Sequence, residues 1–250
     1  FNTYIANSKE DKNRLTDAYL RMADCNYISS KYWPAMDAYN KAIELKCVDA
    51  DYAAFQKGMS YGFVNKNDKK IEDLTKFVST YKTSQYLDDA LYELGNTYTA
   101  EEMNDKAIST FDNLINNNKN SAYVAKSILK QGLIYYNTDK DDAAITKFKK
   151  VVAEFPNSPE SLEAVATAKS IYKANGKVGE YAAWVKTLSF VEVTDAELDN
   201  DMYESAEKQY LNNSPKKAIE GFTSYVAQFP NGLHALQEHF YLAQLYFADK

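Results

Sequence analysis

The sequence predicts an all-α fold, a right-handed superhelical solenoid of antiparallel helix pairs with about six repeats of 37 residues and a half-repeat at each end. Three observations predict it. Small residues recur at a fixed period, large apolar residues follow them at fixed offsets, and short polar stretches divide each unit in two. Eight glycines and five prolines are few for 250 residues, which favours helices over an all-β fold.

A column of small residues sets the register of the repeat. Its period is 37 residues, except for one step of 35 at the N-terminal end. The small residues are Ala23, Gly58, Gly95, Gly132, Ala206 and Ala243, and Lys169 stands where the fifth repeat would have one. A column held in phase over this length indicates that each unit has the same internal structure.

The second half of each unit has columns of its own. Twelve residues after the small residue comes another small one, Ala35, Ala107, Ala144 or Ala218, with Lys70 and Tyr181 as exceptions. Four residues later lies a large apolar side chain: Tyr39, Leu74, Phe111, Phe148, Val185 or Phe222. Steps of three and four residues are typical of amphipathic helices. We therefore expect a hairpin in each unit, with the two small residues facing each other across it.

Helix ends are marked by capping residues. Ser158-Pro159 and Ser214-Pro215 each place an N-cap before a proline in the first helical position. Thr194 and Glu197 have the spacing of a capping box. Pro156 and Pro230 follow the second helix of their units, where each would end it.

The repeat divides the chain as follows. Residues 1–14 are the end of a preceding repeat, 15–188 are repeats 1 to 5, 189–200 are an irregular connector, and 201–250 are repeat 6 with the first helix of repeat 7. Because both ends are half-units, we expect the array to continue in both directions. Lys169 and Tyr181 replace small residues in the fifth repeat, so we expect the superhelical path to change between residues 169 and 200.

Composition narrows the class of partner. The net charge of −6 does not suit nucleic acid, whose phosphates favour a basic surface. The sequence holds no run of about 18 apolar residues, the length that a transmembrane helix needs.

These columns resemble the tetratricopeptide repeat. The match is carried by LGNTY (94–98) with Ala107, Phe111 and Leu114, and by QGLIYY (131–136) with Ala144, Phe148, Val151 and Pro156. It covers about residues 15–248. The longer period, with EFPNSPE (154–160) and QFPNGLHA (228–235), is similar to TolA-binding and outer-membrane assembly lipoprotein repeats of Gram-negative bacteria. DAYLRMADCNY (17–27) with YNKAIEL (39–45) is similar to long repeat proteins of Bacteroides-like bacteria.

The resemblance implies that partners lie in a concave groove lined by the first helix of each unit. The lining positions are three before, one after and four after the small residue. Of these we expect contact from Phe55, Met59, Tyr92, Asn96, Leu129, Leu133, Tyr136, Tyr203, Glu207, Tyr210, Phe240 and Gln244. The strip is aromatic with few charges, which suits an apolar or extended peptide. The alternative is that these rings pack between adjacent first helices.

Residues that could carry chemistry are few. His234 and His239 are five apart and do not share a helix face as a metal-binding pair would. Cys25 and Cys47 fall at opposite ends of their hairpin, so we expect two free thiols, at least one of them buried. No phosphate-binding loop or nucleophile motif occurs. We predict no enzyme activity, no cofactor and no metal.

The expected function is a non-catalytic protein–protein interaction scaffold that binds a protein or peptide in its groove. The resemblance implies a periplasmic or outer-membrane-associated location, with the cytoplasm as the alternative. A regulatory or targeting module of a longer multidomain protein is the alternative function. Self-association is a further possibility.

Overall fold

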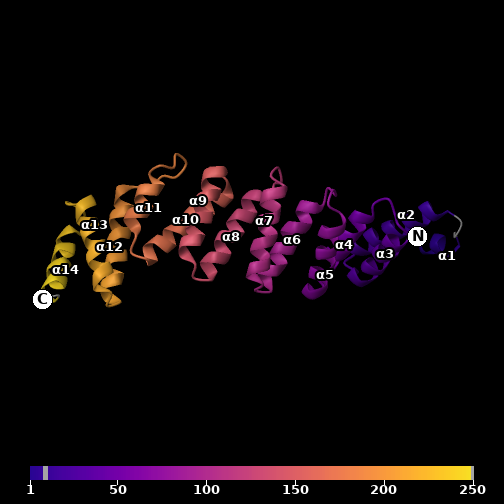
Figure 1. Cartoon of the computed structure of the whole chain (residues 1–250), viewed down its shortest axis with the longest axis horizontal. Helices are drawn as coiled ribbons and strands as arrows, with labels where there is room; N and C mark the ends of the chain where they lie inside the picture. Colours follow the sequence, from indigo (N-terminus) through magenta and orange to yellow (C-terminus); the bar gives the residue numbers. More distant parts are fainter. Residues whose placement is uncertain (8–10, 249–250) are drawn as a thin grey trace. The chain divides into compact units, whose positions relative to one another are not determined.

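The computed structural model describes residues 1–7 and 11–248, and these contain fourteen helices and no strand (Figure 1). The helices are α1 (Asn2–Asn7), α2 (Lys12–Ile28), α3 (Tyr32–Glu44), α4 (Ala50–Phe63), α5 (Asn67–Thr80), α6 (Leu87–Ala100), α7 (Asn104–Asn117), α8 (Val124–Asn137), α9 (Asp141–Glu154), α10 (Pro159–Ala174), α11 (Val178–Val185), α12 (Asp195–Leu211), α13 (Pro215–Gln228) and α14 (Ala235–Ala248). The predicted all-α class is confirmed. Residues 8–10 and 249–250 of the predicted terminal half-repeats lie outside the described residues.

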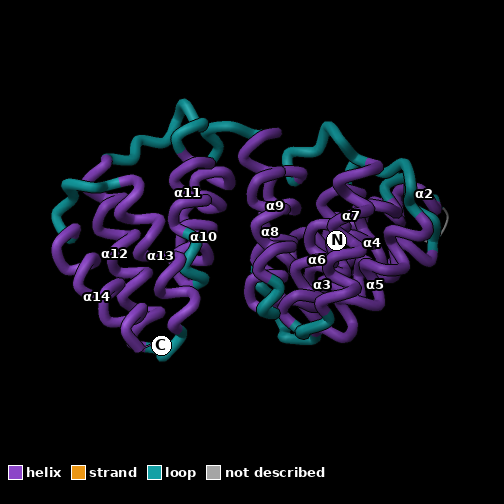
Figure 2. The backbone as a smooth tube through the Cα atoms, turned by 60° about the vertical axis from the view of Figure 1, so that its left-hand side comes forward, coloured by secondary structure: helices purple, strands orange, loops and turns teal. Residues whose placement is uncertain are grey.

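The chain forms two compact units, Phe1–Ser127 and Ile128–Lys250, so the division falls within α8. In the first unit α2 packs on α3, α4 on α5 and α6 on α7, and each pair also packs on the next. In the second unit α9 packs on α10 and α12 on α13, and α14 packs on α13. Figure 2 shows these helices joined by short loops at their ends.

Each hairpin turns through a residue with left-handed backbone, seven residues after the small residue of its repeat. These residues are Ser30, Asn65, Glu102, Asp139, Gly176 and Asn213, with φ between 55° and 76°. The N–H of the next residue donates to a carbonyl five residues back, as from Lys66 to Tyr61 (3.0 Å) and from Met103 to Tyr98 (2.8 Å). This is the Schellman pattern that ends helices. It gives every hairpin the same tight reversal.

The small residues meet the large ring of the second helix. A Cβ added to Gly95 would lie 2.5 Å from the Phe111 ring, and one added to Gly132 would lie 2.5 Å from Phe148. Both rings are fully buried. The side chain nearest to each of these two glycines is therefore the ring sixteen residues later, and the expectation that the second small residue faces the glycine stays a prediction. Truncating such a ring to alanine costs about 3–5 kcal/mol.

The fifth repeat departs from the pattern. Its second helix, α11, has only eight residues, and residues 186–194 form no helix before the capping box of Thr194 and Glu197 begins α12. Tyr181 is buried, with its ring 6.2 Å from the ring of Tyr172 and 6.3 Å from that of Trp184. The expected change in superhelical path here remains a prediction.

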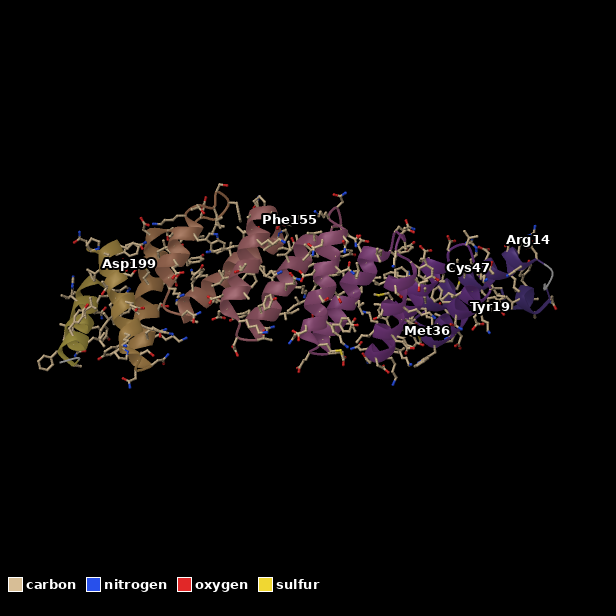
Figure 3. The ribbon with its side chains drawn as sticks, viewed as in Figure 1. Arg14, Tyr19, Met36, Cys47, Phe155 and Asp199 are labelled. Atoms are coloured by element: carbon tan, nitrogen blue, oxygen red, sulfur yellow. The ribbon has the colours of Figure 1, made fainter. Side chains whose placement is uncertain are left out.

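Two further predictions about local structure are confirmed. Ser158 caps α10 by accepting a hydrogen bond from the Ser161 N–H at 3.1 Å, with Pro159 in the first turn. Cys25 is a free, exposed thiol and Cys47, labelled in Figure 3, is a free, buried one. Ser214 is the N-cap of α13, as expected, but its side chain makes no capping hydrogen bond.

Candidate functional site

A hollow of about 330 Å³ lies between α4 and α6, at two of the predicted groove positions. Met59 and Asn96 both line it. The other lining residues are Gly62, Phe63, Asn67, Lys70, Glu93, Thr97 and Ala100. The first helices of the second and third repeats therefore share a recess on the predicted surface.

An ion pair forms one wall of this hollow. Lys70 stands where four other repeats have alanine, and its stem passes Gly62, which has no side chain to block it. The Lys70 Nζ lies 2.8 Å from Glu93 Oε2 of the next repeat, and the two side chains are 11% and 30% exposed. Lysine at this position thus links two repeats and places charge beside the apolar side chains of Met59 and Phe63.

The polar side chains that line the hollow differ in whether they already make hydrogen bonds. The Thr97 hydroxyl donates to the Glu93 carbonyl of its own helix at 2.7 Å, and the Asn67 amide donates to Glu101 at 2.8 Å. The Asn96 amide has no hydrogen-bond partner within the described part of the chain. A half-buried amide of this kind offers a donor and an acceptor to a bound backbone.

The ring three residues before the small residue stacks on a ring of the following repeat. Phe55 stacks on Tyr86 at 5.6 Å and Tyr92 stacks on Tyr123 at 4.5 Å, with interplanar angles of 10° and 16°. In the second unit Tyr203 stacks on His234 at 4.0 Å. These rings join consecutive repeats. Tyr203 is only 8% exposed, and Leu129, at the same position of the fourth repeat, is only 5% exposed.

The second unit carries a polar cluster on α12 and α14. Glu207 accepts hydrogen bonds from the Tyr203 hydroxyl at 2.5 Å and the Tyr241 hydroxyl at 3.3 Å. Burial, together with the charge of Glu207, raises the pKa of Tyr203 well above its ordinary value. The Tyr210 hydroxyl donates to Gln244 at 3.1 Å. Glu207, Tyr210 and Gln244 of the predicted set are therefore brought together.

The remaining predicted residues lie outside this cluster, except that the Phe240 ring lies 6.2 Å from the ring of Tyr241. Tyr136 near the end of α8 is 38% exposed, Phe240 on α14 is 61% exposed, and Leu133 is partly buried. Sequence reasoning missed Tyr241 and the stacking partners Tyr86, Tyr123 and His234. Those three share one place in the 37-residue period, nine residues before the small residue, so the column could have been found.

Groups for catalysis or metal binding are scarce among the described residues. No three His, Cys, Asp or Glu side chains there are placed to hold a metal ion. His234 is stacked on Tyr203, and its Nε2 is 2.8 Å from the Asn200 side chain. None of the described helices is both long enough and apolar enough to cross a membrane.

Comparison with known protein families identifies the type of repeat in part of the chain. The tetratricopeptide repeat model matches residues 89–121 and 126–158, which cover α6, α7, α8 and α9. No curated protein sequence matches the chain.

Solved structures show the same fold. MamA matches at a TM-score of 0.56 and 21% identity, over 79% of this chain and 93% of MamA. PilF of Pseudomonas aeruginosa matches at a TM-score of 0.52 and 12% identity, over 96% of this chain and 99% of PilF. A tetratricopeptide repeat protein of Parabacteroides merdae matches at a TM-score of 0.51 and 12% identity, over 92% of this chain and 98% of that protein. At these identities the likeness concerns the fold alone.

The fold is that of an all-α helical-repeat protein. Two of its repeats, at residues 89–121 and 126–158, match the tetratricopeptide repeat model.

Proposed function

We propose that the chain is a non-catalytic scaffold that holds an extended peptide or protein segment against the first helices of its repeats. The hollow between α4 and α6 carries this proposal. It combines the apolar side chains of Met59 and Phe63 with the Asn96 amide, so it can take one apolar side chain of a ligand and hydrogen-bond the backbone beside it.

We select the residues proposed to contact the partner by how exposed their side chains are. Leu129 and Tyr203 are buried, and Phe55 and Tyr92 stack on rings of the next repeat, so we assign these four to repeat stacking. The contacts that remain are Met59, Asn96, Leu133, Tyr136, Glu207, Tyr210, Phe240 and Gln244. Partner contact at each of them stays a proposal.

We place the scaffold in the bacterial cell envelope, in the periplasm or at the outer membrane. The support is the resemblance of its 37-residue repeats to those of envelope proteins. A regulatory or targeting module of a longer multidomain protein is the second candidate. The full-length gene separates the two, because an export signal with repeats throughout favours the first and an added enzyme domain favours the second.

A displayed peptide library tests the binding proposal. Peptides selected on the wild-type chain are measured against Met59→Ala and Asn96→Ala by fluorescence anisotropy. Each variant should weaken binding about tenfold, the loss expected for an anchor contact or a hydrogen bond in a recess.

The matched control is Ser109→Ala, an exposed position on the second helix α7, which should bind like the wild type. Unchanged affinity for both hollow variants would refute the site. Failure to select any peptide would count against an extended-peptide ligand.

A further inference from the structure

The ends of the first two hairpins expose large apolar side chains. Ile28, at the end of α2, is 82% exposed, and Phe63, at the end of α4, is 54% exposed. Trp33, in the first turn of α3, is also 54% exposed. Isolated exposed side chains are normal in soluble proteins, but a contiguous exposed apolar patch indicates an interaction surface.

Ring contacts join the aromatic side chains of these two hairpin ends in two groups. Tyr32 stacks on Phe63 at 4.7 Å, and Tyr27 lies edge-on to both rings at 5.7 and 5.8 Å. Trp33 lies edge-on to Tyr61 at 6.4 Å. The turn after α2 and the turn after α4 are thereby held side by side. The patch, called the aromatic tip below, consists of Tyr27, Ile28, Tyr32, Trp33, Tyr61 and Phe63.

Two lysines lie beside the aromatic tip, and one acidic residue, Asp68, follows in the first turn of α5. Lys31 and Lys66 are the N-cap residues of α3 and α5, and both are exposed. Within the described residues neither lysine has an ion-pair partner. Neither helix start has a side-chain capping hydrogen bond, so N–H groups of both first turns are open to an anion.

The turns of the second unit lack this combination. Lys140 and Lys177 occupy the same N-cap positions of α9 and α11. Lys140, however, is flanked by three carboxylates, those of Asp139, Asp141 and Asp142. The large apolar side chain exposed at those turns is Tyr136, and at 38% it is less exposed than Ile28, Trp33 or Phe63. The lysines are thus a general feature of the repeat, whereas the aromatic tip belongs to the first two repeats.

We propose that the aromatic tip is a contact site for an anionic phospholipid surface. Tryptophan and tyrosine favour the membrane interface because their rings are apolar and their polar groups stay hydrated. Lysines beside them gain from phosphate headgroups. Ile28, Trp33 and Phe63 enter the headgroup region, and Lys31 and Lys66 pair with phosphates. The proposed lipid contact is a second function beside peptide binding. The two surfaces share Phe63, which also lines the peptide hollow.

Vesicle binding tests the proposal on the whole chain. Co-sedimentation is measured with vesicles of phosphatidylglycerol and phosphatidylcholine, and with phosphatidylcholine alone. The wild type should bind the anionic vesicles, and salt should weaken this binding. Trp33→Ser with Phe63→Ser, and separately Lys31→Glu with Lys66→Glu, should each reduce binding about tenfold or more.

The matched control is Leu211→Ser, because Leu211 is 72% exposed and holds the same place in the sixth repeat as Phe63 does in the second. It should bind like the wild type. Circular dichroism of each variant confirms that the helices are retained. No binding by the wild type, or equal binding by all variants, would overturn the proposal. So would concentration-dependent mass that Phe63→Ser abolishes, since the tip would then join protein to protein.

Discussion

Ala90 in the first unit and Glu238 in the second hold the same place in their repeats, and both are fully buried. That place lies five residues before the small residue. Along the chain it is filled by Ala18, Ala53, Ala90, Ser127, Ala164, Asp201 and Glu238, all of them buried. The first unit ends this column with a hydroxyl, whereas the second ends it with two carboxylates. A buried position that holds a methyl group in most repeats therefore holds a carboxyl group in the last two.

Asp201 is compensated by the preceding repeat. Its carboxylate oxygens lie 2.6 Å from Lys169 Nζ and 2.8 Å from Lys173 Nζ. Burial acts to raise the pKa of Asp201, but the hydrogen bonds and charges of the two lysines outweigh it and hold the pKa below its ordinary value. Lys169, which breaks the small-residue column, is thus matched by an acid one repeat later.

Glu238 has no such compensation. The places that Lys169 and Lys173 occupy in the fifth repeat hold Ala206 and Tyr210 in the sixth. Neither carboxylate oxygen of Glu238 has a hydrogen-bond partner within the described residues. Burial raises the pKa of Glu238 to about 8, and the charges of Asp199 (Figure 3) and Glu207 add to the effect. We therefore expect the docking of α14 to depend on the protonation of Glu238.

The largest expected effect is the pH dependence of α14. The folded chain keeps the Glu238 proton up to about pH 8, while the unfolded segment loses it above its ordinary pKa of 4.5. Opening of α14 thus releases a proton, so its stability should fall as pH rises from 4.5 to 8, by about 2–4 kcal/mol.

Native-state hydrogen exchange of α14 at several pH values measures this free energy of opening. Glu238→Gln has the same size without the titrating proton, and it should remove the dependence. The same pH profile in both proteins would show that Glu238 does not control α14.

Removing the partners of Asp201 should have the next largest effect. Lys169→Met with Lys173→Met leaves the acid buried and unpaired, which should cost about 2 kcal/mol of the free energy of unfolding. Both lysine side chains are about one-third exposed, at 36% and 33%, so water moderates the loss. Urea unfolding measures it. Adding Asp201→Ala should recover most of the stability, and no recovery would mean that the lysines act through packing alone.

The smallest effect belongs to Ser127. Among the described residues its buried hydroxyl has no hydrogen-bond partner, at a place where four other repeats hold alanine. Ser127→Ala should leave the midpoint of urea unfolding unchanged or raise stability by less than about 1 kcal/mol. The reverse change, Ala90→Ser, should lower stability by a similar amount. A clear loss from Ser127→Ala would reveal a partner for the hydroxyl.

Much of the fold could be predicted because a 37-residue period repeats the same packing. The columns identified Gly95 and Phe111, and capping residues located the starts of α10 and α12. The columns did not predict which side chain of the second helix packs against the glycine of the first. Residues 12 and 16 positions later lie on the same helix face, and only the actual crossing of the helices places the Phe111 ring there.

The candidate site was harder to predict, because its contacts join different repeats. Met59 and Asn96 were expected on the surface and do line a hollow. The ion pair of Lys70 and Glu93, 23 residues apart, depends on how two hairpins stack. A stacked ring such as Tyr92 has the same sequence pattern as an exposed one. Periodicity indicates which face a side chain lies on, but not whether the next repeat covers it.

The central claim is that a partner binds the first helices at the hollow between α4 and α6. Nuclear magnetic resonance of the selected peptide bound to the chain tests it most directly, through the Met59 methyl and the Asn96 side-chain amide. Both signals should shift on saturation, while signals of the second helix α7, which does not line the hollow, stay in place. Shifts confined to α7, with Met59 and Asn96 unmoved, would contradict the claim.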